Sequence, residues 1–309
     1  MYPLKMVPVF KDNIWGGKRL RDEYGKNTPY DITGESWEVA SHKNGESKVA
    51  NGEYAGKTIK ELTFILKEKL LGDAVYVADD MKFPLLVKFI DARDNLSVQV
   101  HPNDEYASQN ENGELGKTEM WYVMDATPGA GLLYGFKEPI TKQQFVKSIE
   151  ENSLLEYTKF IPCKRGDSFF IPAGTLHAIG EGLLIAEIQQ NSDTTYRIYD
   201  YDRRDFKGNP RELHVDKAVD VTNLNPAADY NFDGNIIADC SYFKVEKHTV
   251  DGKYSRSVSK DRFEIVVVCD GNVNINGVEF AKGETALIPA YIGEVFMKGK
   301  AAILIAYVK

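Results

Sequence analysis

Short runs of apolar residues separated by turn-forming residues dominate the chain. Gly, Pro, Asn and Asp fall between these runs, which is typical of short β-strands joined by turns. The pattern predicts strands at 85–89, 97–101, 119–124, 131–135, 168–172, 183–189, 243–248, 263–269, 285–289 and 302–308. Many short strands without regularly alternating helices predict a mainly β protein made of closed or sandwiched antiparallel sheets.

A few segments have helical spacing instead. Residues 57–73 carry apolar side chains one helical turn apart at Ile59, Leu62, Ile65, Leu66 and Leu70. Gly72 is placed to end this helix, and Thr141 is placed to cap a second one over 141–157. Residues 214–223 predict a short third helix.

An internal repeat lies within the strand pattern. Residues 164–179 and 281–296 both read Gly, an acidic residue, three further residues, and then Ile-Pro-Ala. Five residues after the proline, the first copy has His177 and the second has Glu294. The repeat predicts two related β-domains, of which only the first keeps the histidine. Because 223–235 has the composition of a linker, we place a first domain at 1–228, with an N-terminal extension and helical insertions, and a second, degenerate domain at 229–309.

Composition excludes several classes of protein. The net charge is −8 with no Lys/Arg run or basic stripe, which argues against a nucleic-acid-binding protein. No segment reaches the ~18 consecutive apolar residues of a membrane helix, and the first residues lack the apolar region of a signal peptide. The three cysteines, Cys163, Cys240 and Cys269, are widely spaced and form no CxxC pair. We therefore expect a cytoplasmic protein without disulfides or a thiolate metal site.

The predicted strand 97–101 has one polar face. Ser97, Gln99 and His101 point to one side, and two valines point to the other. This alternation suits a strand that lines a site on one side and packs on the other. An ordinary exposed strand that ends in a surface histidine is the alternative.

The predicted strand that follows Lys117 has a similar arrangement. Lys117 and Glu119 share a face and are followed by Trp121, in a stretch that is expected to be buried. Such a pair is most often a solvated ion pair of little energetic worth. A carboxylate at the start of a buried strand needs a partner, however, and a metal ion is one candidate.

The first copy of the repeat carries a motif. Gly166, Pro172, Gly174 and His177 follow the spacing G-x5-P-x-G-x2-H, which resembles the second conserved motif of the cupin superfamily. Glycines permit tight bends, and the proline ends the strand. His177 is therefore either a core histidine at a strand end or a ligand that the turn directs inward. The first cupin motif is only partly present, as Gln99-x-His101 followed by Glu119.

Several segments in one order resemble a narrower family. They are NIWGGKRL, GESWEVASH, LSVQVHPNDEYA, GKTEMWYV, IPAGTLHAIGEG and NSDTTYRIYDYDR. Together they span roughly residues 10 to 217 and closely resemble type I mannose-6-phosphate isomerases of the short bacterial form. The resemblance implies two cupin-type jelly-roll or β-barrel domains with a few short helices.

The resemblance also implies a metal site. In that family zinc is held by residues that fall here on Gln99, His101, Glu119 and His177. Two imidazoles, a carboxylate and an amide oxygen suit zinc and leave a position open for water or substrate. Other divalent transition metals also suit this ligand set. We expect one ion per chain.

The implied reaction interconverts mannose 6-phosphate and fructose 6-phosphate through a cis-enediol. The resemblance assigns Arg197, Lys117, Glu187 and Asp193 to catalysis, and Ser97, Lys88, Lys117 and Arg197 to the phosphosugar. The general base stays open among Lys117, Glu187, Asp193 and a metal-bound water. Without the resemblance, Arg197 would be interpreted as a surface ion-pair residue beside its Asp neighbours. A monomer or a homodimer is expected.

Two other functions compete with this hypothesis. One is an iron-dependent cupin dioxygenase, which oxygen uptake would reveal. The other is a sugar-binding cupin without catalysis, which needs no metal with an open position, so metal analysis separates it from the enzymes.

Overall fold

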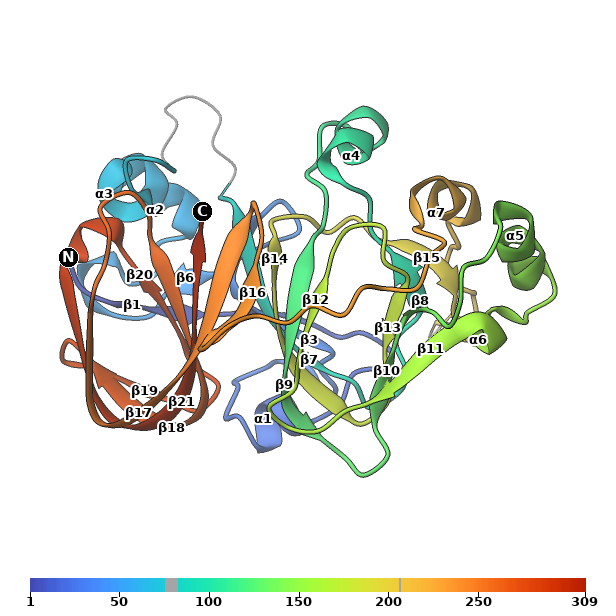
Figure 1. Ribbon diagram of the computed structural model, residues 1–309. Helices are drawn as coiled ribbons and strands as arrows, with labels where there is room; N and C mark the ends of the chain where they lie inside the picture. Colours follow the sequence, from blue (N-terminus) through green and yellow to red (C-terminus); the bar gives the residue numbers. More distant parts are fainter. Residues whose placement is uncertain (76–82, 206) are drawn as a thin grey trace.

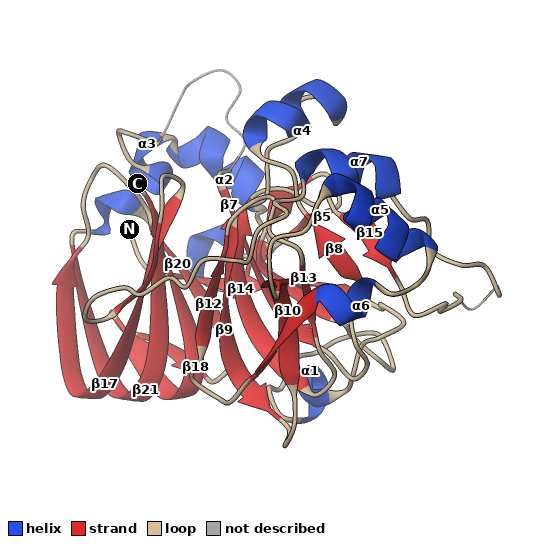
Figure 2. Ribbon diagram, turned by 45° about the vertical axis from the view of Figure 1, so that its right-hand side comes forward, coloured by secondary structure: helices blue, strands red, loops and turns tan. Residues whose placement is uncertain are grey.

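Antiparallel strands form three large sheets in the computed structural model, which describes residues 1–75, 83–205 and 207–309 (Figure 1). The prediction of a mainly β, cupin-type fold is confirmed. A six-stranded and a five-stranded sheet form the first barrel, and an eight-stranded sheet forms most of the second (Figures 1 and 2). None of the helices in the described residues is long and apolar enough to cross a membrane.

Strands from distant parts of the sequence lie side by side in each sheet. From one edge to the other, the six-stranded sheet contains β12 (Ser168–Ile171), β9 (Glu119–Ala126), β14 (Leu183–Gln190), β7 (Leu85–Asp91), β3 (Glu35–Val39) and β2 (Val9–Lys11). The five-stranded sheet contains, in the same sense, β11 (Thr158–Pro162), β10 (Gly131–Phe136), β13 (His177–Ile179), β8 (Val98–Val100) and β15 (Tyr196–Tyr199). The eight-stranded sheet contains β16 (Ile236–Asp239), β17 (Phe243–Ser257), β21 (Glu294–Val308), β18 (Glu264–Ile275), β20 (Thr285–Ile288), β1 (Leu4–Val7) and β6 (Lys48–Val49), with β19 (Val278–Ala281) paired to β18. Strands β4 (Ser41–His42) and β5 (Gly45–Glu46) form a separate hairpin.

Several strands are longer than the sequence pattern predicts. Strand β17 continues past Gly252, and β18 continues past Gly271, although both glycines have positive φ angles. The pairing of β18 with β21 shifts register between Val268 and Asp270, so the chain bends at a bulge and the strand does not end there. Glycines that read as turn signals in the sequence therefore lie inside continuous strands.

The helices are short and lie outside the barrels (Figures 1 and 2). They are α1 (Arg19–Asp22), α2 (Ile59–Leu66), α3 (Glu68–Leu71), α4 (Asp104–Asn110), α5 (Lys142–Glu150), α6 (Leu154–Tyr157) and α7 (Val215–Val221), with 3-10 turns η1 (Gly52–Tyr54) and η2 (Ala290–Ile292). Thr141 caps α5, as predicted. The predicted helix 57–73 is instead two helices separated at Lys67, whose φ is +52°. Ile65, expected on the buried face, is 53% exposed.

The core is divided by the central strand β14. Leu183 and Ile185 face the interior of the first barrel, whereas Leu184 and Ile188 face an apolar layer that reaches the second barrel. This second layer includes Phe243 of β17. Because both faces of β14 are buried, its sequence is an almost continuous apolar run. The few polar residues of this strand are buried as well. Burying a polar side chain costs free energy unless a hydrogen bond or an ion pair compensates for the lost contacts with water.

The N-terminal segment joins the sheet of the second barrel. Leu4 of β1 pairs with Leu287 of β20, and Met6 pairs with Val49 of β6. The eight-stranded sheet thus takes two strands from residues before 50 and the others from residues after 235. The division of the chain at 228/229 stays a prediction.

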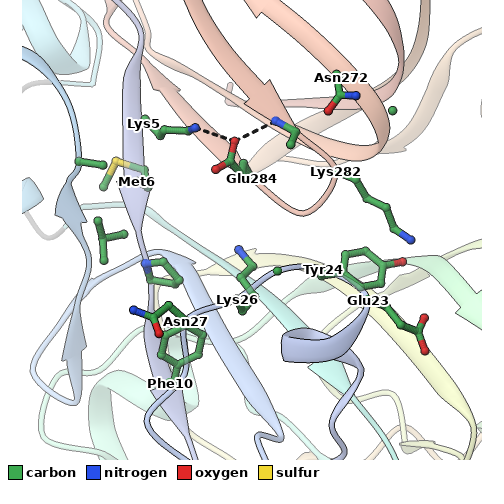
Figure 3. Close-up of a pocket in the computed structure, with 16 residues that line it drawn as sticks. Lys5, Met6, Phe10, Glu23, Tyr24, Lys26, Asn27, Asn272, Lys282 and Glu284 are labelled. Carbon is green, nitrogen blue, oxygen red and sulfur yellow. Dashed lines mark hydrogen bonds and ion pairs between the residues drawn. The ribbon is translucent and has the colours of Figure 1, made fainter.

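A cleft of about 690 Å³ lies beside this N-terminal segment (Figure 3). Tyr24 and Lys26 line one side of it, and Lys5 of β1 lines the other side with Asn272 of the second barrel. Lys282 of the second barrel also lines the cleft. Lys282 lies over the ring of Tyr24, with Nζ 4.1 Å from the ring centre. None of the candidate site residues predicted from the sequence lines this cleft.

Candidate metal centre and active site

Polar side chains form a row across the five-stranded sheet. Gln99 of β8 lies directly opposite His177 of β13 on one side and opposite Arg197 of β15 on the other. Directly opposite residues in antiparallel strands share one face of the sheet. The register therefore places Arg197, Gln99 and His177 side by side.

The turn before β13 holds His177 in place. Gly174 has φ +86°, and its backbone N–H donates to the carbonyl of His101 over 2.8 Å. A Cβ atom at this position would lie 2.9 Å from the Val221 carbonyl oxygen, so the turn requires glycine for space as well as for φ. This bond ties the turn to the end of β8, which brings the two histidines together.

His101, Glu119 and His177 form a buried cluster. Their potential ligand atoms all lie within 4.8 Å of one another, and each side chain is at most 1% exposed. Nε2 of His101 lies 3.6 Å from Glu119 Oε2, and Nε2 of His177 lies 3.4 Å from Glu119 Oε1. Oε1 accepts no hydrogen bond from any described residue.

Backbone carbonyls fix the tautomers of both histidines. Nδ1 of His101 lies 2.8 Å from the Thr194 carbonyl, and Nδ1 of His177 lies 2.9 Å from the Thr175 carbonyl. Since a carbonyl can only accept, each Nδ1 carries the hydrogen and donates it. Each Nε2 therefore presents a lone pair to the cluster, which is the arrangement seen in metal-binding histidines.

The pKa values of the cluster follow from its burial. Burial lowers the pKa of His177 to about 4 and lowers the pKa of His101 well below its usual range. Both imidazoles are thus neutral at pH 7. Burial, together with the charge of Glu187, raises the pKa of Glu119 to about 7, although Lys117 opposes this change. The two imidazole lone pairs and the Glu119 carboxylate lie close together in a site buried from water, and this arrangement favours a bound cation.

Gln99 and Lys117 complete this cluster. Nε2 of Gln99 lies 3.3 Å from Nε2 of His177, and Ser97 Oγ lies 3.5 Å from Oε1 of Gln99. Lys117 donates from Nζ to His101 Nε2 over 3.0 Å and also to Glu119. The structure therefore brings together the four residues predicted as metal ligands, with Ser97 and Lys117 beside them.

A second charged group lies next to the cluster in the six-stranded sheet. Glu187 Oε1 is 3.5 Å from Lys88 Nζ and 3.8 Å from Lys117 Nζ. Burial alone would raise the pKa of Glu187, but the two lysines outweigh it and lower that pKa. Burial alone would lower the pKa of Lys88, but Glu35 and Glu187 outweigh it and raise that pKa. Glu187 is thus a carboxylate and Lys88 an ammonium at neutral pH.

Two of the predicted residues lie at the margin of this site. Asp193 is exposed and accepts a hydrogen bond from the side chain of Asn44 over 2.9 Å. Arg197 is half-buried, and its Nη1 donates to the Glu212 carbonyl over 2.8 Å. Its Nε is buried and makes no hydrogen bond within the described part of the chain.

Sequence reasoning missed three residues that touch these groups. Trp121 Nε1 donates to Glu187 Oε2 over 2.9 Å, and Trp37 Nε1 donates to Glu35 Oε2 over 2.6 Å. Glu35 Oε2 is also 3.8 Å from Lys88 Nζ. Strand alternation places Trp121 on the same face as Glu119, and this signal could have found it.

Family profiles and curated relatives that match this chain all belong to one kind of enzyme. A family profile described as phosphomannose isomerase type I, catalytic domain, matches residues 3–124, and one described as mannose-6-phosphate isomerase, cupin domain, matches residues 234–308. The mannose-6-phosphate isomerase ManA of Bacillus subtilis is 41% identical over 99% of this chain and 98% of its own length. The mannose-6-phosphate isomerase of Streptococcus mutans is 37% identical over 93% of this chain and 92% of its own length.

Solved structures give the same result for the fold. The crystal structure of the mannose 6-phosphate isomerase from Bacillus subtilis has a TM-score of 0.89 and 36% identity, and the alignment covers 99% of each chain. A mutant of phosphomannose isomerase from Salmonella typhimurium has a TM-score of 0.80 over 100% of both chains at 17% identity, which is a likeness of fold alone.

Proposed function

The chain belongs to the type I phosphomannose isomerase family, and on this basis we propose that it interconverts mannose 6-phosphate and fructose 6-phosphate with zinc as its cofactor. The buried cluster of His101, Glu119 and His177 is the observation that carries the proposal. The names of the relatives indicate the substrate, and the cluster is a candidate site for the metal.

The donor set fits a zinc ion. His101 and His177 would bind it through Nε2, and Glu119 through the oxygen that lacks a hydrogen bond. Gln99 would bind it through its amide oxygen once the amide turns by 180°, because the amide nitrogen is the atom that lies beside His177. When bound, the ion supplies positive charge that stabilises negative charge developing on the substrate oxygens. The carbonyl partners of the two Nδ1 atoms hold the rings in the required orientation.

We propose that Glu187 moves the proton between C1 and C2 of the sugar. This transfer, together with a shift of the carbonyl, passes through a cis-enediol and requires an ionised base at the reacting carbons. The lowered pKa of Glu187 supports this role, as does its buried Oε1, which accepts no hydrogen bond from the described residues. Lys88 and Lys117 keep the carboxylate ionised and supply ammonium groups near the developing charge.

We propose that Arg197 binds the phosphate group at the margin of the site. A guanidinium matches the geometry of phosphate oxygens and can offer two parallel hydrogen bonds. Arg197 lies beside Gln99 in the register, and its Nε has no partner among the described residues. With a net charge of −8 on the whole chain, a local cation is needed to hold a phosphate ester.

Metal removal tests the proposed cofactor. Treatment with a chelator is expected to abolish the conversion of mannose 6-phosphate in a coupled assay, and added zinc is expected to restore it. His177→Ala is expected to lose both the metal, measured by elemental analysis, and at least about 100-fold in activity. His248→Ala, in strand β17 of the second barrel, is the control and should change neither.

The possible outcomes separate the parts of the proposal. Full activity after complete metal removal would contradict the zinc dependence but not the isomerase. A protein that binds zinc and leaves mannose 6-phosphate unchanged would contradict the isomerase itself.

A further inference from the structure

The two oxygens of the Glu187 carboxylate have different surroundings. Oε2 accepts a hydrogen bond from Trp121 Nε1, whereas Oε1 faces the two lysines and accepts no hydrogen bond from the described residues. A carboxylate that is 2% exposed exchanges few contacts with water. Its orientation is therefore set by these neighbours alone.

The position of Trp121 determines which oxygen of Glu187 accepts its hydrogen bond. It lies directly opposite Glu187 in the β9–β14 pairing, and its side chain is fully buried. The same ring meets the ring of His177 edge-on, with centroids 5.3 Å apart and an interplanar angle of 80°. An indole that is fully buried and closely packed has little freedom to rotate, so its N–H points in one direction.

We propose that Trp121 is a positioning residue for the proton transfer, a role that rests on the proposed function. The indole N–H holds Oε2 and thereby leaves Oε1 beside the two ammonium groups and free of a hydrogen bond, so that Oε1 is the oxygen able to take the proton. Without that bond, Oε2 would also turn toward the ammonium groups of Lys88 and Lys117, because an ion pair with two bonded oxygens is the better arrangement in a buried site.

A similar contact lies on the other side of Lys88. Trp37 is directly opposite Lys88 in the β3–β7 pairing, and its N–H donates to Glu35. Lys88 is thus flanked by two carboxylates, Glu35 and Glu187, and each accepts a hydrogen bond from an indole. An indole donates but cannot accept a proton, so it directs a carboxylate without competing for the proton that the carboxylate transfers.

Trp121→Phe tests the proposal, because phenylalanine keeps a flat apolar ring and removes the N–H. We expect kcat for mannose 6-phosphate to fall about 10- to 100-fold, the effect of one hydrogen bond to a charged group. KM is expected to stay within about twofold and zinc content to stay near one ion per chain. Phe169→Leu is the matched control, since Phe169 lies opposite Trp121 on β12 and changes packing without removing a hydrogen bond.

A double-mutant cycle with Glu187→Gln locates the effect. If Trp121 acts through Glu187, Trp121→Phe should reduce kcat much less in the Glu187→Gln background than in the wild type. Equal losses in both backgrounds, an unchanged kcat, or loss of zinc from Trp121→Phe would each overturn the proposal. An inactive wild-type protein would overturn the proposed function along with it, whereas an active wild type with an equally active Trp121→Phe variant overturns this inference alone.

Discussion

Two buried glutamates in the first barrel have opposite pKa shifts because their neighbours differ. Burial and the charge of Glu187 raise the pKa of Glu119 to about 7. Lys117 and Lys88 outweigh burial at Glu187 and lower its pKa. Separated pKa values of this kind mark residues with different chemical tasks. The contacts of each carboxylate, and not its residue type, indicate which one is suited to accept a proton.

The contacts of Glu246 in the second barrel also set its pKa, and the effect can be measured as a change in stability. Burial alone would raise its pKa, but hydrogen bonds from Tyr307, His248 and Arg256 bring the pKa to about 2. A lowered pKa stabilises the folded state above the unfolded value of about 4.3, and this contribution is lost as the pH falls toward 2. We expect Glu246→Gln to lower the free energy of unfolding by roughly 2–3 kcal/mol at pH 7, and by about half as much at pH 3.

Urea denaturation at pH 7, 5 and 3 measures this difference. Glu138→Gln serves as the control, because Glu138 is exposed and should change the unfolding free energy little at any of these pH values. A Glu246→Gln penalty that is equal at pH 7 and pH 3 would show that packing, and not the charge, is responsible.

The resemblance to a known family implies the candidate ligands, and local sequence patterns predict only which of their side chains share a face. Strand alternation predicts that Gln99 shares a face with His101 and Lys117 with Glu119, although β8 ends at Val100 and β9 begins at Glu119. The glycine turn directs His177. The contact between Trp121 and Glu187 could not be predicted in this way. It depends on the pairing of β9 with β14, whose register shifts between Leu184 and Ile185. A bulge changes which residues face each other across strands, and alternation along one strand does not reveal it.

At the scale of elements, the break between α2 and α3 shows a limit of helical spacing as a signal. The spacing of apolar residues continues through Lys67, yet Lys67 has φ +52° and ψ −128°, which ends α2 there. The second helix can then turn Leu70 and Leu71 into the core while Ile65 stays exposed. Tertiary packing outweighs the local preference for one continuous helix.

The positive φ at Lys67 predicts a stabilising substitution. Residues with a side chain pay about 1 kcal/mol or more in this conformation, which glycine adopts without strain. Lys67→Gly is therefore expected to raise the free energy of unfolding by about 1 kcal/mol, which thermal unfolding would detect as a rise in Tm of about 2–4 °C.

Lys60→Gly is the matched control for this substitution. Lys60 is an exposed residue within α2, where glycine costs about 0.5–1 kcal/mol relative to a good helix former. The two variants should therefore shift Tm in opposite directions. A fall in Tm for both would contradict strain at Lys67.

At the scale of the whole molecule, a buried ion pair ties the two barrels together. Lys26 donates to Glu38 over 2.7 Å, and Glu38 also accepts from Ser36 and from Thr285 of β20. Glu38 is fully buried, and Lys26 lines the cleft beside the second barrel (Figure 3). The three donors come from the N-terminal loop, the first barrel and the second barrel.

Removal of this lysine is expected to destabilise the entire fold. Lys26→Met leaves a buried carboxylate without its cation, which costs roughly 3–5 kcal/mol of unfolding free energy in denaturant. A double variant that also carries Glu38→Gln should recover part of the loss. Lys5→Met is the control in the same cleft, because the Lys5–Glu284 pair is partly exposed and is expected to contribute less than about 1 kcal/mol. Equal losses for Lys26→Met and Lys5→Met would contradict the importance of burial.

The two barrels share one pairing pattern but differ in charge. Ile171 lies opposite Glu119 in the first barrel, and Ile288, the equivalent residue of the sequence repeat, lies opposite Glu264 in the second. Burial raises the pKa of Glu264 to about 7, as it does for Glu119. Glu264 lies 2.9 Å from the guanidinium of Arg256, whereas Glu119 lies between two imidazoles. The buried glutamate is thus paired with a guanidinium in the second barrel, and with the ammonium of Lys117 and two imidazole nitrogens in the first.

Strand β1 is synthesised long before β20, the strand with which it pairs. A ribosome adds about 5–20 residues per second, so roughly 15–60 seconds separate the appearance of Leu4 from that of its partner Leu287. During this interval β1 can pair with β6, but its other edge stays open. The nascent chain therefore carries an apolar strand edge, available to chaperones and to other nascent chains, until its synthesis is almost complete.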